Sequence, residues 1–270
     1  MINLIIQSIK QSVLPQKNIR IFKKNKIIKT PISEGYLKAD EECNAKAIFE
    51  LAIYKLKKIS PRGKCLDVGC GSGKFLVRLA EEFPEIEFTG IDSSGEMLKL
   101  AKKKIDERGF NNVKLKKLNP LKLNRIKEKF DLITCNFFLH NLKSEFQALN
   151  FINSLLKLLK KRGVLFFFDM TRPKNNKIAL FLADKYNKKF GKEFYEEALN
   201  LYRASFSFYE LKDILKKTNW KNYEHEQPLI GNFFQFVCTK KQNKKILFRP
   251  RLKNFEQKIN YYLLKFFWKI

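Results

Sequence analysis

The sequence predicts an α/β fold, a doubly wound sheet in which five parallel strands are followed by a C-terminal antiparallel hairpin. Short apolar runs alternate with amphipathic helical segments from residue 41 to residue 169, and such alternation produces parallel strands joined by helical crossovers. A glycine-rich turn directly follows the first apolar run, which is where a doubly wound sheet binds its ligands. After Pro173 the alternation stops, so the later segments are additions to this sheet.

The regular part of the chain contains five expected strands and four expected helices. A helix from Glu41 to Ile59 ends at the Ser-Pro-Arg-Gly turn of 60–63. The helices after it are expected at 74–83, at 96–108 and from a Ser144 cap to Lys161, with Gly163 as the stop of the last one. The strands are expected at 65–68, 86–91, 113–118, 130–135 and 164–169.

Beyond Pro173 three helices precede the hairpin. The helices are expected at 177–186, 193–202 and 207–218, and two strands near 221–225 and 233–240 are separated by a Pro228/Gly231 turn. Residues 34–240 are therefore expected to form one domain, with a helical insertion at 177–218 over the carboxyl ends of the strands, on the substrate side. Its aromatic residues are candidates for lining an acceptor pocket: Phe181, Tyr186, Phe194, Tyr195, Tyr202 and Phe206.

Positive charge is concentrated at the two ends of the chain. The net charge is +28; the N-terminal extension (1–33) contains seven Lys or Arg and no acid, and residues 240–270 contain ten against one Glu. Such ends favour an anionic partner, either nucleic acid or lipid headgroups. A biased composition is the alternative, since Lys, Asn, Ile and Phe are all abundant and solvated lysines need no partner.

The C-terminal segment 241–270 is expected to end in a basic amphipathic helix. From 255 to 270 a stripe of large apolar residues falls on one helical face, with Lys258, Lys265 and Lys269 outside it. Three uses remain open: packing on the domain or on a second subunit, peripheral contact with an anionic membrane surface, and support of nucleic-acid binding. The sequence does not predict the oligomeric state.

Other compartments and metal chemistry are disfavoured. No run approaches the roughly 20 uninterrupted apolar residues of a membrane span, and the apolar stretch at 2–6 is followed by no small-residue cleavage site. Five scattered cysteines are typical of reduced thiols, and two histidines give no zinc spacing. We expect a cytoplasmic protein without a metal site, with peripheral association with the inner membrane face as a further option.

The segment 66–73, Leu-Asp-Val-Gly-Cys-Gly-Ser-Gly, carries the chemical information. Its first two glycines permit a tight turn and a close approach of backbone to ligand, and the helix that follows offers free N–H donors. Lys74 stands where a dinucleotide fingerprint requires glycine. Asp67 would attract a cationic amine and repel a pyrophosphate, and Asp92, at the end of the second strand, can accept both hydroxyls of a ribose. A cationic amino-acid nucleoside fits better than an anionic dinucleotide.

With these residues the sequence resembles the class I S-adenosylmethionine-dependent methyltransferases of the UbiE-like or Methyltransf_25 kind, from about residue 36 to residue 240. The resemblance rests on CLDVGCGSG at 65–73, GIDSSGEML at 90–98, FDLITCN at 130–136 with FLH at 138–140, and DMTRP at 169–173. It implies a Rossmann-like, seven-stranded fold and S-adenosylmethionine as the cofactor. It implies these cofactor contacts: Asp67, Gly69, Cys70, Gly71, Gly73, Asp92, Ser93, Met97, Asn119, Pro120, Asn136 and Phe137.

Roles follow from the same resemblance. Asp67 and Gly69 would hold the methionine amino group, Gly71 and Gly73 would let the loop pass beneath the cofactor, and Asp92 would bind the ribose. Met97 would pack near the adenine. The third strand of the family commonly ends in an aspartate that accepts a hydrogen bond from the adenine amine. Here Asn119 stands in that place, so its amide oxygen would accept the bond without the help of a charge.

The acceptor side of the site is less well specified. Candidate substrate residues are Tyr36, His140, Asp169 and Arg172. His140 is a candidate general base, or else a packing residue that positions its loop, because methyl transfer from an activated sulfonium can rely on alignment. Arg172 could pair with an acidic substrate, or structurally with Asp169 or Asp184. His225 is expected at the surface.

The sequence therefore predicts an S-adenosylmethionine-dependent methyltransferase acting on a small or lipophilic acceptor. An RNA or tRNA methyltransferase that uses the basic ends is the alternative enzyme. A non-catalytic S-adenosylmethionine-binding or scaffold protein is the alternative from another class. The absence of a Pro-Cys pair at Cys135 and of an Asn-Pro-Pro-aromatic sequence after the fourth strand disfavours cytosine C5 and amino methylation.

Overall fold

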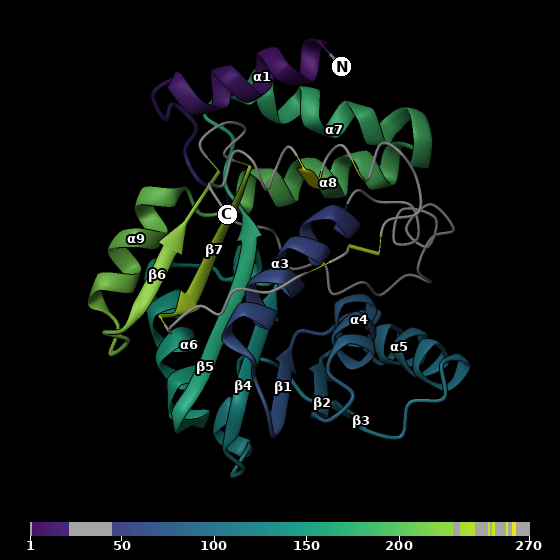
Figure 1. The fold of residues 1–270 in the computed structure, drawn as a ribbon. Helices are drawn as coiled ribbons and strands as arrows, with labels where there is room; N and C mark the ends of the chain where they lie inside the picture. Colours follow the sequence, from purple (N-terminus) through teal and green to yellow (C-terminus); the bar gives the residue numbers. More distant parts are fainter. Residues whose placement is uncertain are drawn as a thin grey trace.

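A seven-stranded sheet forms the centre of the molecule. The computed structural model describes residues 2–21, 45–228, 233–240, 248, 250–251, 258 and 261–262 (Figure 1). The strand order is β3-β2-β1-β4-β5-β7-β6. The strands are β1 Lys64–Val68, β2 Glu87–Asp92, β3 Val113–Lys117, β4 Phe130–Asn136, β5 Leu159–Met170, β6 Tyr223–Glu226 and β7 Phe234–Thr239.

The pairing directions are those that the sequence predicts. Strands β1 to β5 are mutually parallel, whereas β7 is antiparallel to β5 and β6 is antiparallel to β7. The strand order reverses at β1, between β2 and β4, so the switch point of the doubly wound sheet lies at the carboxyl end of β1. This confirms the α/β fold with its C-terminal hairpin and places the glycine turn after β1 at the expected binding crevice.

Helices cover both faces of the sheet and its carboxyl edge. They are α1 Ile2–Val13, α3 Ala45–Ile59, α4 Lys74–Glu82, α5 Gly95–Glu107, α6 Glu145–Leu158, α7 Asn176–Phe190, α8 Lys192–Ala204 and α9 Phe208–Lys217. One core cluster joins α3 and α4 to the sheet, and a second joins α6 and α9 to the opposite face. Strand β5 contributes residues to both clusters: Phe166 and Phe168 belong to the first, and Leu165 and Phe167 to the second.

A third cluster lies at the carboxyl edge, where Figure 1 shows α1, α7 and α8 above the strand ends. Ile178 and Leu182 of α7 pack against Leu199 and Tyr202 of α8, together with Phe233 at the start of β7. These two helices belong to the predicted insertion and lie over the carboxyl ends of the strands, as expected (Figure 1). Helix α9 differs from that prediction, because its apolar residues pack on α6 at the sheet face. No helix among the described residues has the length and apolar content needed to span a bilayer.

The predicted helix from Ser144 to Lys161 is too long at its C-terminal end. Ser144 does cap α6 through the Gln147 N–H, but the helix ends at Leu158 and the chain is already extended at Leu159, which pairs with Phe130 of β4. The pairing shifts in register before Leu132, so a bulge absorbs the basic residues 160–162. Gly163 is therefore part of β5 and not a helix stop; a Cβ there would lie 3.0 Å from the Phe130 carbonyl oxygen.

Candidate active site

The glycine loop between β1 and α4 adopts the strained backbone that its glycines permit. Gly69, Gly71 and Gly73 all have positive φ, at 74°, 53° and 76°. A Cβ on Gly73 would lie 2.8 Å from the Cβ of Ala101 in α5, so this position sets how closely α4 and α5 pack. A Cβ on Gly71 would meet nothing within 4 Å. The loop thus leaves open space beside Gly71, where a ligand can approach the backbone.

Asp92, the last residue of β2, binds directly to this loop. Its Oδ2 accepts the Gly71 N–H at 3.0 Å and its Oδ1 accepts the Ser94 N–H at 2.8 Å. The Ser94 hydroxyl caps α5 by accepting the Met97 N–H. Because each carboxylate oxygen has two acceptor directions, Asp92 holds the loop and keeps capacity for two hydroxyl donors.

Asp67 is a buried carboxylate inside strand β1. Only 3% of its surface is exposed, and its Oδ1 accepts the Thr134 hydroxyl at 2.7 Å. Burial raises the pKa of Asp67 from 3.8 to about 7; the Thr134 hydrogen bond opposes this shift and the negative charge of Asp92 adds to it. A carboxylate that is this costly to ionise gains from a cationic ligand group, which would supply the missing counter-charge.

The remaining residues predicted around an adenosine lie at the ends of β2 and β3. Met97 and Pro120 are buried, and Ser93 is exposed. The Leu118 N–H donates to the Asp92 carbonyl, which brings the segment after β3 beside β2. Asn119 is exposed, and its Oδ1 already accepts the Leu121 N–H at 2.9 Å. An adenine amine at this place would have to share that oxygen.

Asn136 and Phe137, also predicted as cofactor contacts, lie at the end of β4. The Asn136 Oδ1 accepts the Phe168 N–H at 3.2 Å, while its Nδ2 is buried without a hydrogen-bond partner. Phe137 has a φ of 52°, rare for a residue with a side chain, and its ring meets that of Phe168 edge to face. Cys70 is half buried, and burial raises the pKa of its thiol, which stays neutral.

His140 and Asp169 form a buried pair at the carboxyl ends of β4 and β5. The His140 Nδ1 lies 3.1 Å from Asp169 Oδ1, and Asp169 Oδ2 accepts the Leu139 N–H at 2.6 Å. Both side chains are at most 5% exposed. Asp169 therefore fixes the loop after β4 and one ring nitrogen of His140, so any proton exchange with an acceptor would have to use Nε2.

Arg172 lies apart from the glycine loop and is held by protein groups. Its Nε donates to the Asn18 carbonyl, and its two terminal nitrogens donate to the Ser205 carbonyl and the Glu210 carboxylate. The ion pair with Glu210 replaces both predicted partners, Asp169 and Asp184, because the N-terminal segment and the start of α9 enclose the guanidinium. Tyr36 lies outside the described residues, as does most of the predicted helix 255–270.

His225 is not a surface residue, which corrects the prediction. It is half buried on β6, its ring stacks on Phe208 at 4.1 Å between centroids, and its Nε2 lies 3.0 Å from Gln235 Oε1. Burial lowers the pKa of His225 to about 4. Side chains alternate between the two faces of a strand, and His225 lies on the face of β6 that packs against α9. The sequence does not show which face this is.

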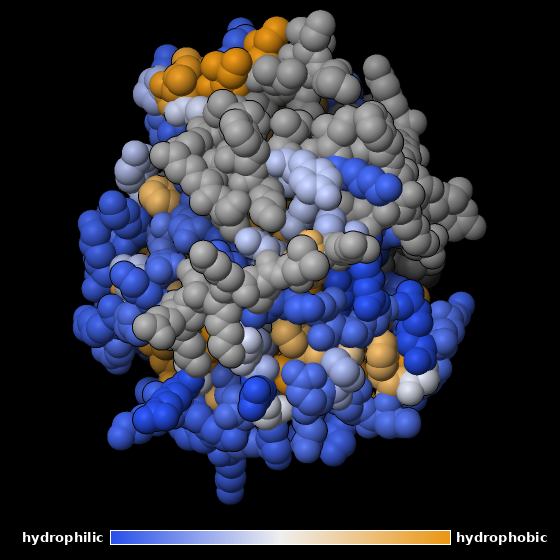
Figure 2. Space-filling view, viewed as in Figure 1, coloured by the Kyte–Doolittle hydropathy of each residue, from blue (hydrophilic) through white to orange (hydrophobic). Residues whose placement is uncertain are grey.

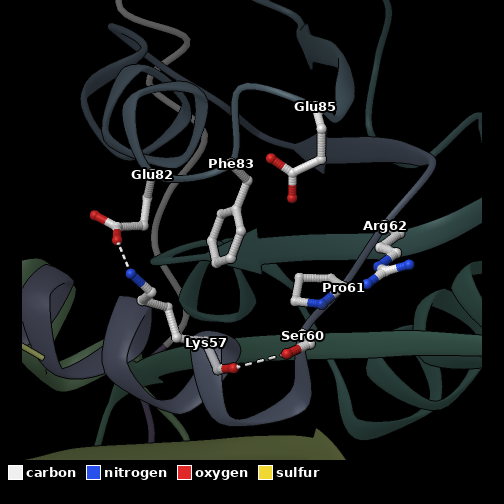
Figure 3. A pocket seen from close by; sticks show the side chains of 7 residues that line it. All are labelled: Lys57, Ser60, Pro61, Arg62, Glu82, Phe83 and Glu85. Atoms are coloured by element: carbon white, nitrogen blue, oxygen red, sulfur yellow. Dashed lines mark hydrogen bonds and ion pairs between the residues drawn. The ribbon is translucent and has the colours of Figure 1, made fainter. Parts of the chain in front are cut away.

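A hollow of about 220 Å³ lies at the opposite end of the sheet (Figure 3). It is lined by residues that follow α3 and α4 and precede β1 and β2, including Ser60, Pro61 and Phe83. Lys57 and Glu82 pair across it, and Arg62 and Glu85 complete a mixed-charge lining. It lies at the amino ends of the strands, where a doubly wound sheet does not bind its ligands. Among the described residues no cluster of His, Cys, Asp and Glu could hold a metal ion.

The comparisons with known proteins agree with this geometry. A family model described as a methyltransferase domain matches residues 59–246. The chain belongs to the methyltransferase-domain family. The methyltransferase domain resembles the plantazolicin methyltransferase BpumL in complex with SAH, with a TM-score of 0.58 and 16% identity over 77% of this chain and 91% of that one. It also resembles a SAM-dependent methyltransferase from Aquifex aeolicus, with a TM-score of 0.56 and 20% identity over 78% and 98% of the two chains.

These likenesses establish the class I, Rossmann-like methyltransferase fold. Among curated relatives, the demethylmenaquinone methyltransferase of Listeria welshimeri is 33% identical over 120 residues, which cover 44% of this chain and 50% of that protein. An uncharacterised protein of Rickettsia prowazekii is 36% identical over 110 residues, covering 41% and 44%. The matches thus span about half the length of these relatives.

Two residues of the site were missed by sequence reasoning. Thr134 pairs with Asp67 because β1 and β4 are neighbours in the register Asp67↔Thr134, and no local signal gives the register of distant strands. Ser94 could have been found, since a serine three residues before Met97 at a helix start is a capping signal.

Proposed function

We propose that this chain is an S-adenosylmethionine-dependent methyltransferase. The observation that carries the proposal is the arrangement of two carboxylates around an open glycine loop, with Asp67 buried and Asp92 bound to the Gly71 N–H. The residues fit the cofactor: Asp67 suits its cationic amine, Asp92 retains acceptors for the ribose hydroxyls, and the space beside Gly71 suits close contact with the backbone. The relatives named as methyltransferases support the same assignment.

The reaction would be a direct in-line transfer. The cofactor supplies a methyl group bonded to a positively charged sulfur, so that attack by an acceptor atom forms the new bond to carbon as the old carbon–sulfur bond breaks and its electron pair returns to sulfur. The chain's residues would bind and align the partners, which in favourable cases lowers a barrier by about 7–11 kcal/mol. Asp169 would keep the loop after β4 in place through the Leu139 N–H.

His140 would act as a positioning residue in this reaction. Its Nδ1 is engaged with Asp169 and its ring is 5% exposed, which favours a role in shaping the loop over proton transfer. A general base is needed only when the acceptor must lose a proton. The pH profile of a His140→Asn variant tests this role, since loss of a base would change the profile and loss of a loop contact would lower the rate at every pH.

We propose a small lipophilic molecule as the acceptor. The carboxyl edge is covered by α7 and α8, and Met170 at the end of β5 packs against their apolar cluster. The curated relatives that are named demethylmenaquinone methyltransferase support an acceptor of the quinone kind. Of the candidate aromatic residues, Tyr202 is buried in this cluster and Phe181 and Tyr195 pack against it, whereas Phe206 is buried in the cluster on the sheet face.

The experiment is methyl transfer from radiolabelled S-adenosylmethionine into three separate pools: a bacterial lipid extract, a water-soluble metabolite extract and total RNA. We expect label in the lipid pool, abolished by Asp92→Ala. Label in RNA alone would replace this acceptor with nucleic acid. No label in any pool, with the cofactor bound, would favour the non-catalytic alternative.

A further inference from the structure

Helix α1 turns its apolar face toward solvent. Ile6, Ile9 and Val13 are 41%, 47% and 72% exposed, and at 100° per residue they lie within about 60° of one another around the helix. Gln11 lies on the opposite side and is fully buried. A surface helix normally buries its apolar stripe and exposes its polar side. In α1 the two sides are exchanged.

Specific contacts fix α1 in this orientation. The Gln11 amide donates to the Arg172 carbonyl at 3.4 Å and its Oε1 accepts the Lys174 N–H at 2.8 Å. The N–H groups of Lys17 and Asn18 both donate to the Lys174 carbonyl. Leu14 packs against the cluster formed by α7 and α8. The outward face of α1 is therefore set by its attachment just beyond the end of β5.

Two further large apolar side chains are exposed after the helix. Ile19 and Ile21 follow in an irregular segment, so half of the ten large apolar side chains that the described residues expose lie in 2–21. Figure 2 shows hydrophobic colour over α1 at the top of the molecule. We call the exposed face of α1, formed by Ile6, Ile9 and Val13, the docking face.

Basic side chains lie beside the docking face. Lys10 and Lys17 are exposed in and just after α1, and Lys177 is exposed at the start of α7, the helix next to α1 in Figure 1. No Asp or Glu occurs in residues 1–33. The face thus combines exposed apolar side chains with neighbouring lysines, which is the combination that interfacial helices use to bind anionic lipid.

We propose that the docking face of α1 binds the surface of an anionic lipid bilayer. A second copy of this chain is the competing occupant, and the charge distribution disfavours it. A symmetric dimer through this face would bring two sets of lysines together, whereas anionic headgroups attract them. Three partly immersed apolar side chains on a short helix provide weak, reversible attachment, and the lysines add attraction that salt screens.

The position of the docking face connects it to the proposed function, on which this part of the inference rests. Because α1 is attached to residues 172–174, directly after β5, binding to a bilayer would turn the carboxyl edge of the sheet toward the lipid. A lipophilic acceptor could then reach the edge that carries Asp169 and His140 without crossing water.

The test is co-sedimentation of the full chain with phosphatidylglycerol-containing vesicles, compared with pure phosphatidylcholine vesicles. We expect binding to the anionic vesicles that weakens with salt. The variant Ile6→Ser/Ile9→Ser/Val13→Ser should lower the partition coefficient on the order of tenfold or more. Phe146→Ser is the matched control, because Phe146 on α6 is 72% exposed, as is Val13, and lies outside the face; it should bind as the wild type does.

Each other outcome overturns the inference. Equal vesicle binding by the triple variant would assign the attachment to another segment. A wild-type chain that does not bind vesicles but forms a dimer that the triple variant disrupts would make the docking face a subunit interface. Calorimetric binding of S-adenosylmethionine by the same triple variant separates this result from failure of the proposed function, because the face does not touch the glycine loop.

Discussion

Replacing Asp67 with asparagine should stabilise the folded protein at neutral pH and weaken its proposed cofactor binding. The pKa of Asp67 is about 7 in the folded state instead of 3.8. Between these two pH values the folded state holds a proton that the unfolded chain has lost, so this group makes the wild type less stable as the pH rises through that window. At 1.36 kcal/mol per pKa unit, the full cost above pH 7 is about 4 kcal/mol.

The asparagine side chain resembles the protonated carboxyl and can still accept the Thr134 hydroxyl, so Asp67→Asn removes the pH-dependent cost. At pH 5 the Asp67 carboxyl already destabilises the wild type by roughly 2 kcal/mol. The stability gained by Asp67→Asn should therefore be about 2–3 kcal/mol larger at pH 8 than at pH 5. For a domain of this size, that is a rise in Tm of roughly 5–10 °C relative to the wild type.

The assay is urea and thermal unfolding of both proteins at pH 5 and pH 8, without cofactor. Comparing the two pH values cancels any pH-independent effect of the substitution. Asp213→Asn is the control, because Asp213 is exposed and paired only locally with Lys216, and it should show no comparable gain. If the Asp67→Asn variant gains nothing between pH 5 and pH 8, the carboxyl is not desolvated and the argument for a cationic ligand fails.

Two further changes test the loop and the hairpin. Gly71→Ala should lower the free energy of unfolding by about 1 kcal/mol because of the positive φ, and should reduce S-adenosylmethionine affinity in calorimetry. Gly73→Ala should lower it by roughly 2–3 kcal/mol or more, because the new Cβ meets Ala101. If the two variants were equally stable, the packing of α4 on α5 would be contradicted. The wild type should lose about 2–3 kcal/mol of stability between pH 7.5 and pH 4.5, because the pKa of His225 is about 4 in the folded state and 6.5 in the unfolded state. His225→Gln should remove this loss, as measured by urea unfolding at both pH values. A variant that loses the same stability in acid would refute the argument.

The sequence predicts the sheet well because each β–α unit carries its own local signals. The strand predicted at 65–68, the glycine turn and the Ser144 cap are decided by residues within a few positions of one another. The end of α6 was missed because Leu159 leaves the helix to pair with Phe130, nearly 30 residues away. Tertiary pairing overrode a helical pattern that continued to Lys161.

The candidate site shows the same division between local and distant information. The two acidic residues in or at the end of the first two strands and the glycine spacing are local signals, so the carboxylates of Asp67 and Asp92 are identified from the sequence. The partners of Arg172 and His225 were not, because Glu210 and Phe208 reach them from α9, which lies on the sheet face and not over the strand ends. Long-range packing, which leaves no mark in a short window of sequence, decides those roles.

The central claim is that the loop after β1 and the carboxylate at the end of β2 bind S-adenosylmethionine. Calorimetric titration with S-adenosylmethionine, its demethylated product and NADH tests it, using the wild type, Asp92→Ala and Asp92→Asn. The asparagine variant can still accept the Gly71 N–H and so preserves the loop. We predict that the wild type binds both sulfur nucleosides and not NADH, and that both variants bind them at least about tenfold more weakly, as expected when a charge-assisted hydrogen bond is lost. Wild-type protein that is folded but binds neither sulfur nucleoside would contradict the account.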